Sequence, residues 1–313
     1  MVGELLDDGS HEVRVGGNLG TPALDLLDPA ADWYVLELSS FQLERMGSGT
    51  FDIGAILNIS ADHLDRHGSF DAYARAKRRV YAGCRAAVYN GRDANTRPPA
   101  ELPAIALDAD AGWRVAGNEL IIGGTPFPLS SFRLGGRHNA CNVLAACAIA
   151  SLTGADTRPE RLFNFRGLPH RSAFVGAVGS VRCIDDSKAT NVGACAAALA
   201  GFGEVERNIV LIAGGDGKNA SFEPLKAPVA RYAKHVVLIG RDAPLMAKAL
   251  AGVVPVSLAA DMDQAVAKAL AAARGRGLVL LSPACASFDM FDDFEARGDA
   301  FQAAVERAAR TRG

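Results

Sequence analysis

Short apolar runs alternate along this chain with longer, alanine-rich segments whose apolar positions recur at helical spacing. Apolar runs of about four to seven residues are typical of buried strands, and the longer segments are typical of amphipathic helices. This alternation predicts an α/β fold. The predicted strands are Trp33–Glu37, Ile53–Asn58, Ala86–Tyr89, Val181–Asp185, Ile209–Ala213, Val236–Gly240 and Leu278–Ser282. The predicted helices are Phe70–Cys84, Asn139–Leu152, Gly193–Gly201, Pro244–Ala251, Met262–Ala273 and Arg297–Thr311.

Glycine and proline interrupt this pattern in a way that predicts two domains. The 313 residues are enough for two domains of roughly 150 residues each. Glycine and proline at Phe165–Pro169 mark a helix end and a boundary, which separates 1–166 from 167–313. Before the boundary, residues 100–136 have short apolar runs among glycines and prolines, and irregular β structure is expected there. After it, strand and helix alternate five times, the pattern of a doubly wound, Rossmann-like parallel sheet.

The composition excludes several classes of protein. Hydrophobic residues make up 49% and charged residues 22%, so the chain is able to bury a core and is not disordered. The formal net charge is −2 and the longest basic run is Lys77-Arg78-Arg79, which argues against nucleic acid as a partner. The sequence has no apolar run of about 18 residues, so no membrane span is predicted. An acidic start without a basic segment, and cysteines without a Cys-x-x-Cys pair, predict a cytoplasmic protein with reduced, buried cysteines.

Polar side chains follow two predicted strands of the first domain. Glu37 ends the first of these strands and is followed by Ser39, and Asp62, His63 and Asp65 follow the second. In open α/β sheets, ligands bind outside the carboxyl ends of strands. Carboxylates together with a phosphate suit Mg²⁺, although imidazole is a less usual ligand for it. The alternative is that these polar residues only cap loops.

Lys77 lies on the apolar face of the predicted helix Phe70–Cys84. At 100° per residue it shares a stripe with Tyr73, Val80 and Tyr81. A desolvated amine loses its proton more readily, and a neutral amine reacts with carbon dioxide to form a carbamate, which is a carboxylate-like metal ligand. The residue pattern alone favours a simpler interpretation, in which the amine reaches solvent along the helix surface.

Three predicted strands of the second domain end in polar or glycine-rich loops. These loops are Asp186–Asn191, Gly214–Lys218 and Pro283–Ser287. Hydroxyl groups and the backbone N–H groups at helix N-termini bind anions, and Lys188 and Lys218 add positive charge. Three such loops along one sheet edge predict a site for a small anionic ligand. The alternative is ordinary turn and helix-cap chemistry.

The printed sequence lacks the pattern of a phosphate-binding P-loop. G-x-x-x-x-G-K-[ST] occurs nowhere in it, and its one Gly-Lys pair, Gly217-Lys218, is followed by Asn219. No loop of this kind is therefore present to hold the β- and γ-phosphates of ATP.

These residues lie in stretches that together resemble the Mur ligases, and within that family the branch that adds glutamate. The stretches run in family order over essentially the whole chain, and ELSSFQLE with DSKATN separates this branch from ligases that add other amino acids. The matching stretches are VGGNLGTPAL (15–24), ELSSFQLE (37–44), ILNISADHLDRH (56–67), YARAKRRVY (73–81), GRHNACN (136–142), GLPHR (167–171), DDSKATNVG (185–193), AGGDGK (213–218) and LSPACASFDMFDDFEARGDAF (281–301).

The resemblance implies an ADP-forming amide ligase of peptidoglycan and cell-wall biosynthesis, and hence a role in cell shape and cell division. In that family ATP phosphorylates the lactoyl-alanine carboxylate of UDP-N-acetylmuramoyl-L-alanine. The glutamate amine then attacks the acyl phosphate, and phosphate leaves. The resemblance also implies Mg²⁺, ATP as co-substrate and a monomer. The implied fold is a Mur ligase central domain without its P-loop over 1–166, followed by a Rossmann-like, glutamate-binding domain over 167–313.

The resemblance also assigns roles to individual residues. By position, the catalytic residues and metal ligands are Glu37, His63 and Lys77, with the lysine carbamylated as in the family. The alanyl end of the UDP-sugar is matched by Asn18 and Ser39, and glutamate by Thr190, Lys218, Ser287 and the backbone of Phe294. The nucleotide is matched by Asn139 near adenine and by Arg171, Asp186 and Lys188.

Two features depart from the family pattern. Family members have a uridine-binding domain and a P-loop strand ahead of the position matched by Met1, so we expect an N-terminally truncated ligase that is inactive by itself. Ala173 stands where many members carry an acid. The alternatives are a non-catalytic remnant that binds glutamate or nucleotide, and a half-enzyme completed by a separate chain. The nucleotide sequence upstream of Met1 would distinguish them.

Overall fold

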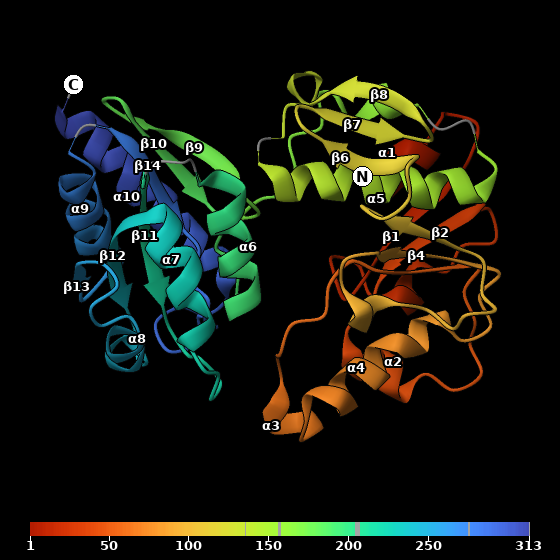
Figure 1. The fold of residues 1–313 in the computed structure, drawn as a ribbon, viewed down its shortest axis with the longest axis horizontal. Coiled ribbons are helices and arrows are strands. Elements are labelled where there is room, and N and C mark those ends of the chain that lie inside the picture. The colour runs from red at the N-terminus through yellow and green to blue at the C-terminus, as the bar shows by residue number, and fades with distance from the viewer. Residues whose placement is uncertain (135, 156–157, 204–206, 275, 313) are drawn as a thin grey trace. The chain divides into compact units, whose positions relative to one another are not determined.

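The computed structural model shows a chain that divides into two compact units (Figure 1). Unit 1 contains residues 1–135 and 139–165, and unit 2 contains residues 136–138 and 166–313. Each unit has its own hydrophobic core. The structure describes residues 1–134, 136–155, 158–203, 207–274 and 276–312, and the side chains of Asp65 and Arg312 lie outside this description.

The described residues of unit 1 form three small sheets. Their strands are β1 (Val13–Gly17) with β2 (Trp33–Glu37); β3 (Ile53–Ile56) with β4 (Ala86–Asn90) and β5 (Ala104–Leu107); and β6 (Trp113–Ala116) with β7 (Glu119–Ile122) and β8 (Thr125–Pro128). The first two sheets are parallel and the third is antiparallel. The region of expected irregular β structure therefore contains a regular meander. Its glycines fall in the turns, and Pro126 and Pro128 lie in the edge strand β8, where the missing N–H of proline is tolerated.

A long helix, α5 (Arg137–Thr153), provides much of the core of unit 1. It is rich in alanine and apolar on nearly all sides, as is usual for a buried helix. It packs in one cluster with Leu5 of α1 (Val2–Leu6), Val88 of β4 and Leu120 of β7. The remaining helices of the unit are α2 (Ser40–Arg45), α3 (Leu64–His67) and α4 (Phe70–Arg78).

The outer strands of all three sheets of unit 1 have an unpaired edge in the described part of the chain. β2 pairs with β1 alone, and β3 pairs with β4 alone. Val15 of β1 and Tyr34 of β2 are 53% and 40% exposed, so apolar side chains of this sheet reach solvent.

Unit 2 is one six-stranded sheet with the strand order β13-β12-β11-β14-β10-β9. The strands are β9 (Ala173–Val178), β10 (Val181–Asp185), β11 (Ile209–Gly214), β12 (Ala233–Ile239), β13 (Val256–Leu258) and β14 (Gly277–Leu281). One face is covered by α6 (Val192–Phe202), α7 (Lys226–Tyr232) and α8 (Ala243–Ala249). The other is covered by α9 (Met262–Ala273) and α10 (Phe294–Arg312) (Figure 1). The α/β fold class, with a Rossmann-like second domain, is confirmed.

Two details of the predicted elements are wrong. The sheet of unit 2 is not entirely parallel, because β9 runs antiparallel to β10. Only two residues, Gly179 and Ser180, separate these strands, and so short a connection permits only a hairpin. The helix predicted to reach Cys84 ends at Arg78, and a 3-10 turn and Gly83, at φ +72°, turn the chain toward β4.

Candidate functional site

Three loops of unit 2 meet at one edge of its sheet. They follow β10, β11 and β14, and β14 lies between the other two strands (Figure 1). Backbone hydrogen bonds join the loops: Ala284 N donates to Ala189 O at 2.9 Å, and Gly214 N donates to Pro283 O at 2.8 Å. Asp216 and Ala286 exchange two more bonds of 3.0 and 2.8 Å. The loops therefore form one continuous rim at the carboxyl ends of parallel strands, where ligands of α/β sheets bind.

The candidate glutamate residues lie on this rim or beside it. Ser287 is 3% exposed, and Thr190 comes immediately before Asn191, whose side chain caps α6. Lys218 has a positive φ of +50°, and its backbone N–H donates to the Asp216 carboxylate at 2.9 Å. The ammonium of Lys188 lies 3.9 Å from the ring centroid of Phe294, within the range of a cation–π contact.

Left-handed backbone is concentrated around these loops. Residues other than glycine seldom adopt a positive φ, and such conformations recur at functional sites. Near the rim of unit 2 they occur at His170, Ser172, Lys218, Asn219 and Ala284. In unit 1, His63 has φ +52° at the start of α3.

Asp186 lies in a buried hydrogen-bonded chain. One carboxylate oxygen accepts from the backbone N and the hydroxyl of Ser172, at 3.0 and 3.2 Å, and the other accepts from Ser282 at 2.9 Å. Burial raises the pKa of Asp186 to about 7. His138 Nε2 lies 2.8 Å from the Ser172 hydroxyl, whereas its buried Nδ1 has no hydrogen-bond partner among the described residues. Burial lowers the pKa of His138 to about 4.

A second buried chain of hydrogen bonds contains Asp185, the residue immediately before Asp186. His170 Nδ1 is 2.7 Å from Asp185 Oδ2, which also accepts a hydrogen bond from Gln302 at 2.8 Å. Asp185 is fully buried, and its other oxygen accepts from Ser187 N at 3.0 Å. This chain holds the segment that carries Arg171, whose side chain is exposed.

The first group of candidate residues in unit 1 lies at the ends of β1 and β2. Asn18 Nδ2 donates to Glu37 Oε2 at 3.1 Å, and the backbone N of Asn18 donates to the carbonyl of Glu37 at 2.7 Å. Ser39 caps α2: its hydroxyl accepts from the Gln42 backbone, and the Gln42 side chain accepts from the Ser39 backbone. The structure thus brings Asn18 and Glu37 together, and Glu37 lies three residues before the start of α2 at Ser40.

The second group is connected through aromatic rings. His63 contacts Phe41 of α2 edge to face, with ring centroids 5.0 Å apart, and Phe41 stacks on His67 at 5.4 Å. His67 contacts Tyr73 of α4, and the Lys77 ammonium lies 5.8 Å from the centroid of the Tyr73 ring. His63 and Lys77 therefore border one aromatic cluster, which begins four residues after Glu37.

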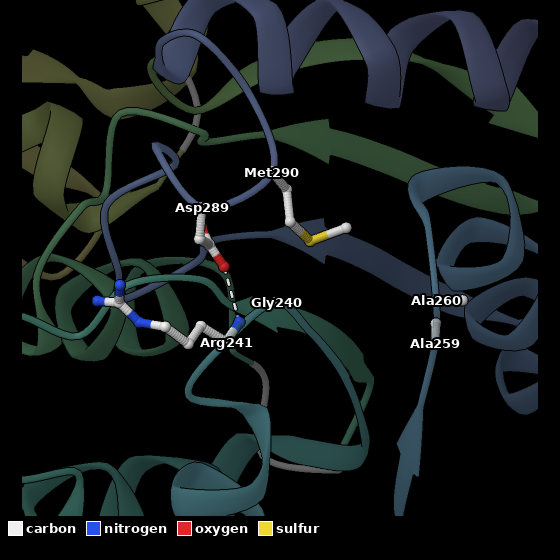
Figure 2. A pocket seen from close by; sticks show the side chains of 6 residues that line it. All are labelled: Gly240, Arg241, Ala259, Ala260, Asp289 and Met290. Atoms are coloured by element: carbon white, nitrogen blue, oxygen red, sulfur yellow. Dashed lines mark hydrogen bonds between the residues drawn. The ribbon is translucent and has the colours of Figure 1, made fainter.

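A cavity of about 590 Å³ lies in unit 2 beside the rim loop that contains Asp216 (Figure 2). Asp289 Oδ2 accepts a hydrogen bond from Arg241 N at 2.7 Å, and the Arg241 guanidinium pairs with Asp216. The buried Asp289 Oδ1 has no hydrogen-bond partner among the described residues. None of the site residues predicted from the sequence lines it. The lining residues are Gly240, Arg241, Ala259, Ala260, Asp289 and Met290.

Known protein families match both units. Residues 18–150 match the Mur ligase middle domain, and residues 170–285 match the glutamate ligase domain of Mur ligases. The chain belongs to the Mur ligase family. The predicted family is thereby confirmed, together with its ligase class.

Several relatives of this Mur ligase are similar over nearly its whole length. It is 44% identical to UDP-N-acetylmuramoylalanine--D-glutamate ligase of Chromohalobacter salexigens, over 96% of this chain and 70% of the relative. It is 43% identical to the ligase of the same name from Pseudomonas aeruginosa, over 99% of this chain and 72% of the relative. MurF ligase from Thermotoga maritima, solved with ADP, has the same fold, with a TM-score of 0.71 at 16% identity over 100% of this chain and 77% of that one.

Several residues of this site have no separate signal in the sequence. The two buried hydrogen-bonded chains of unit 2 include four residues to which the sequence assigned no role: His138, His170, Ser172 and Ser282. His138 and His170 do fall within the stretches GRHNACN and GLPHR, which was the available signal. In unit 1, the described residues contain no group of three His, Cys, Asp or Glu side chains arranged for a metal, so the predicted set depends on Lys77. No helix among the described residues is long and apolar enough to cross a membrane.

Gly215→Ala tests whether the rim of this Mur ligase is as tightly packed as its contacts indicate. Gly215 has φ +129°, and an added Cβ would lie 2.2 Å from the carbonyl oxygen of Ala286. The substitution is expected to lower the free energy of unfolding of unit 2 by about 3 kcal/mol. Gly252→Ala, also at positive φ but with open space around it, is expected to lower it by about 1 kcal/mol. Equal losses in urea denaturation would contradict the packed rim.

Proposed function

We propose that this Mur ligase joins glutamate to UDP-N-acetylmuramoyl-L-alanine at the expense of ATP, in the peptidoglycan pathway of the cytoplasm and as a monomer. The observation that carries the proposal is the three-loop rim of unit 2, where hydroxyl, ammonium and backbone N–H groups lie at the ends of adjacent strands. The names of the relatives, at 43–44% identity, support the same substrate.

The rim is suited to an amino acid with two carboxylates. Lys218 and the Ser287 hydroxyl come from loops on neighbouring strands, so they are able to bind separate carboxylates. Thr190 precedes the N-terminus of the 11-residue helix α6, where the positive end of the helix dipole favours an anion. The backbone of Phe294 completes the set. Held in this way, glutamate would present its amine to an acyl phosphate.

The nucleotide residues divide between the two units. Asn139 lies on α5 in unit 1, whereas Arg171, Asp186 and Lys188 lie in unit 2. The exposed Arg171 guanidinium is suited to phosphate. Asp186 is 9% exposed and both of its oxygens accept hydrogen bonds from serines, so its role would be to hold the loop that carries Lys188.

In unit 1, Glu37, His63 and Lys77 would hold Mg²⁺, and Asn18 and Ser39 would lie beside the alanyl end of the UDP-sugar. The Glu37 carboxylate is exposed and accepts one hydrogen bond from Asn18, which leaves oxygen lone pairs for a hard cation. A carbamate on Lys77 would add a second oxygen donor. Bound Mg²⁺ would neutralise charge on the phosphates of ATP. Asn18 orients Glu37, and the capping box of Ser39 fixes the turn that follows it.

A second candidate function is a glutamate-binding protein without ligase activity. The observation that favours it is the lack of a Gly-Lys-Ser or Gly-Lys-Thr sequence anywhere in the printed chain. Glutamate binding is common to both candidates, and phosphate release distinguishes them.

Glutamate binding by the 313-residue chain tests the proposed site. Lys218→Met and Ser287→Ala are each expected to weaken the binding of radiolabelled glutamate about tenfold, because each removes a donor to a carboxylate. Lys248→Met, which removes an exposed lysine of α8, is the matched control and should leave the affinity unchanged. The measurement is equilibrium dialysis of D- and L-glutamate with glutamine as competitor. Glutamine binding as tight as glutamate binding would contradict a site for two carboxylates.

A further inference from the structure

Arg297 of α10 is almost completely buried in unit 2, with 1% of its surface exposed. Its guanidinium donates three hydrogen bonds: Nε to the Ser187 hydroxyl at 2.9 Å, Nη2 to the Ser187 carbonyl at 2.8 Å, and Nη1 to the Cys285 carbonyl at 3.1 Å. Within the described residues, no carboxylate lies within ion-pair distance of it. The hydrogen-bond partners of this buried cation are all neutral oxygens, and the carboxylates of Asp289 and Asp185 act on it only at longer range.

Burying a charged guanidinium costs free energy. Desolvation lowers the pKa of Arg297 to about 10, which shows how strongly this environment opposes the charged form. A buried guanidinium with only neutral partners adds less stability than an apolar side chain of similar size. Its planar fork, however, holds several acceptors in one fixed arrangement, which an apolar side chain does not do. The fixed arrangement of these acceptors is therefore the feature for which the buried guanidinium needs a functional reason.

The acceptors of Arg297 belong to two loops of the rim. Ser187 immediately precedes Lys188, and Cys285 is two residues before Ser287. Ser187 also donates its hydroxyl proton to the carbonyl of Phe294, at 2.8 Å, and Phe294 provides the ring beneath the Lys188 ammonium. Arg297 therefore ties together the loop after β10, the loop after β14 and the start of α10.

We propose that Arg297 is a positioning residue of the rim, which sets the placement of Ser287 in the proposed glutamate site relative to Lys188 of the proposed nucleotide site. The proposal rests on the proposed function, because the link that Arg297 makes between the two loops is taken to serve the binding of an amino acid. Arg297 does not touch the substrate; it acts through the backbone of Ser187 and Cys285. Lysine at this position would keep the charge but lacks the fork that bonds both carbonyls at once.

The first measurement follows the position of Lys188. Reductive ¹³C-methylation labels the seven lysines of the chain, and the Lys188 signal, identified by its loss in Lys188→Arg, should be shifted upfield by the Phe294 ring. In Arg297→Met and Arg297→Lys, the chemical shift of this signal is expected to move toward the shifts of the other methylated lysines. Met246→Ala, which empties a fully buried site of α8, controls for general destabilisation and should keep the upfield signal.

The second measurement is glutamate affinity of the same variants by equilibrium dialysis. Arg297→Lys and Arg297→Met are expected to bind glutamate about tenfold more weakly than the unsubstituted chain, and Met246→Ala equally well. An unmoved Lys188 signal in Arg297→Met would overturn the proposal, and so would unchanged affinity when the signal moves. Failure of the unsubstituted chain to bind glutamate, with the upfield Lys188 signal present, would instead overturn the proposed function.

Discussion

The 313-residue polypeptide by itself is expected to release phosphate from ATP at least about 10³-fold more slowly than the full-length Pseudomonas aeruginosa ligase. Phosphoryl transfer is accelerated mainly by positioning and by electrostatic stabilisation of the phosphates. In a P-loop, a nest of backbone N–H groups, a lysine and a hydroxyl supply both, and the printed sequence contains no such motif. Lys218 lies in the rim of unit 2, where the proposed site gives it a carboxylate of glutamate. Lys188, proposed to lie beside the nucleotide, is a single lysine and does not supply the nest or the hydroxyl.

The assay mixes purified chain with ATP, Mg²⁺, UDP-N-acetylmuramoyl-L-alanine and glutamate, and measures phosphate. The Pseudomonas aeruginosa enzyme is the positive control, and the chain without glutamate gives the background. Loss of one preorganised donor already reduces the rate about 10²–10³-fold, and a missing loop removes several. Turnover within tenfold of the control would show that another part of this chain holds the phosphates.

The buried pair of Asp186 and His138 is expected to make stability depend on pH in opposite directions in two variants. The pKa of Asp186, raised from 3.8 to about 7, means that its contribution to stability is present below pH 3.8 and is lost as pH rises through 7. The pKa of His138, lowered from 6.5 to about 4, means that its contribution is present above pH 6.5 and is lost as pH falls through 4. In the unsubstituted chain the two slopes largely cancel between these values.

Each substitution removes the pH dependence that one of the two groups contributes to the free energy of unfolding, and leaves that of the other group. Relative to the unsubstituted chain, Asp186→Asn should gain about 4 kcal/mol of unfolding free energy between pH 4 and pH 7. Relative to the unsubstituted chain, the unfolding free energy of His138→Gln should rise by about 3 kcal/mol as the pH falls from 7 to 4. The measurement is urea denaturation followed by far-UV circular dichroism at a series of pH values.

Tryptophan fluorescence provides an internal control. Both tryptophans, Trp33 and Trp113, belong to unit 1, whereas the buried pair lies in unit 2. The fluorescence transition should therefore be the same in all three proteins. Slopes of the same sign in both variants would contradict the opposite pKa shifts of Asp186 and His138.

Local pattern was sufficient for most elements of the sheet in unit 2 and for the residues at its strand ends. β10 and α9 have the predicted bounds, because each is an uninterrupted apolar run or a regular amphipathic repeat between clear turn signals. β1 and β9 were missed, since Gly16, Gly17 and Gly176 weaken their apolar pattern. The antiparallel direction of β9 depended on a two-residue turn that the pattern had not revealed.

The sequence by itself determined the α/β class, the family and the residue types at each strand end, because these are written in contiguous stretches. Only the tertiary structure placed β14 between β10 and β11, and this pairing makes one rim from three distant loops. It also decided that Arg297 clasps Ser187, 110 residues away, and that His138 reaches Ser172 across 34 residues. Such contacts depend on how the chain packs around the sheet, and no periodicity along the chain records which distant polar groups will be buried together.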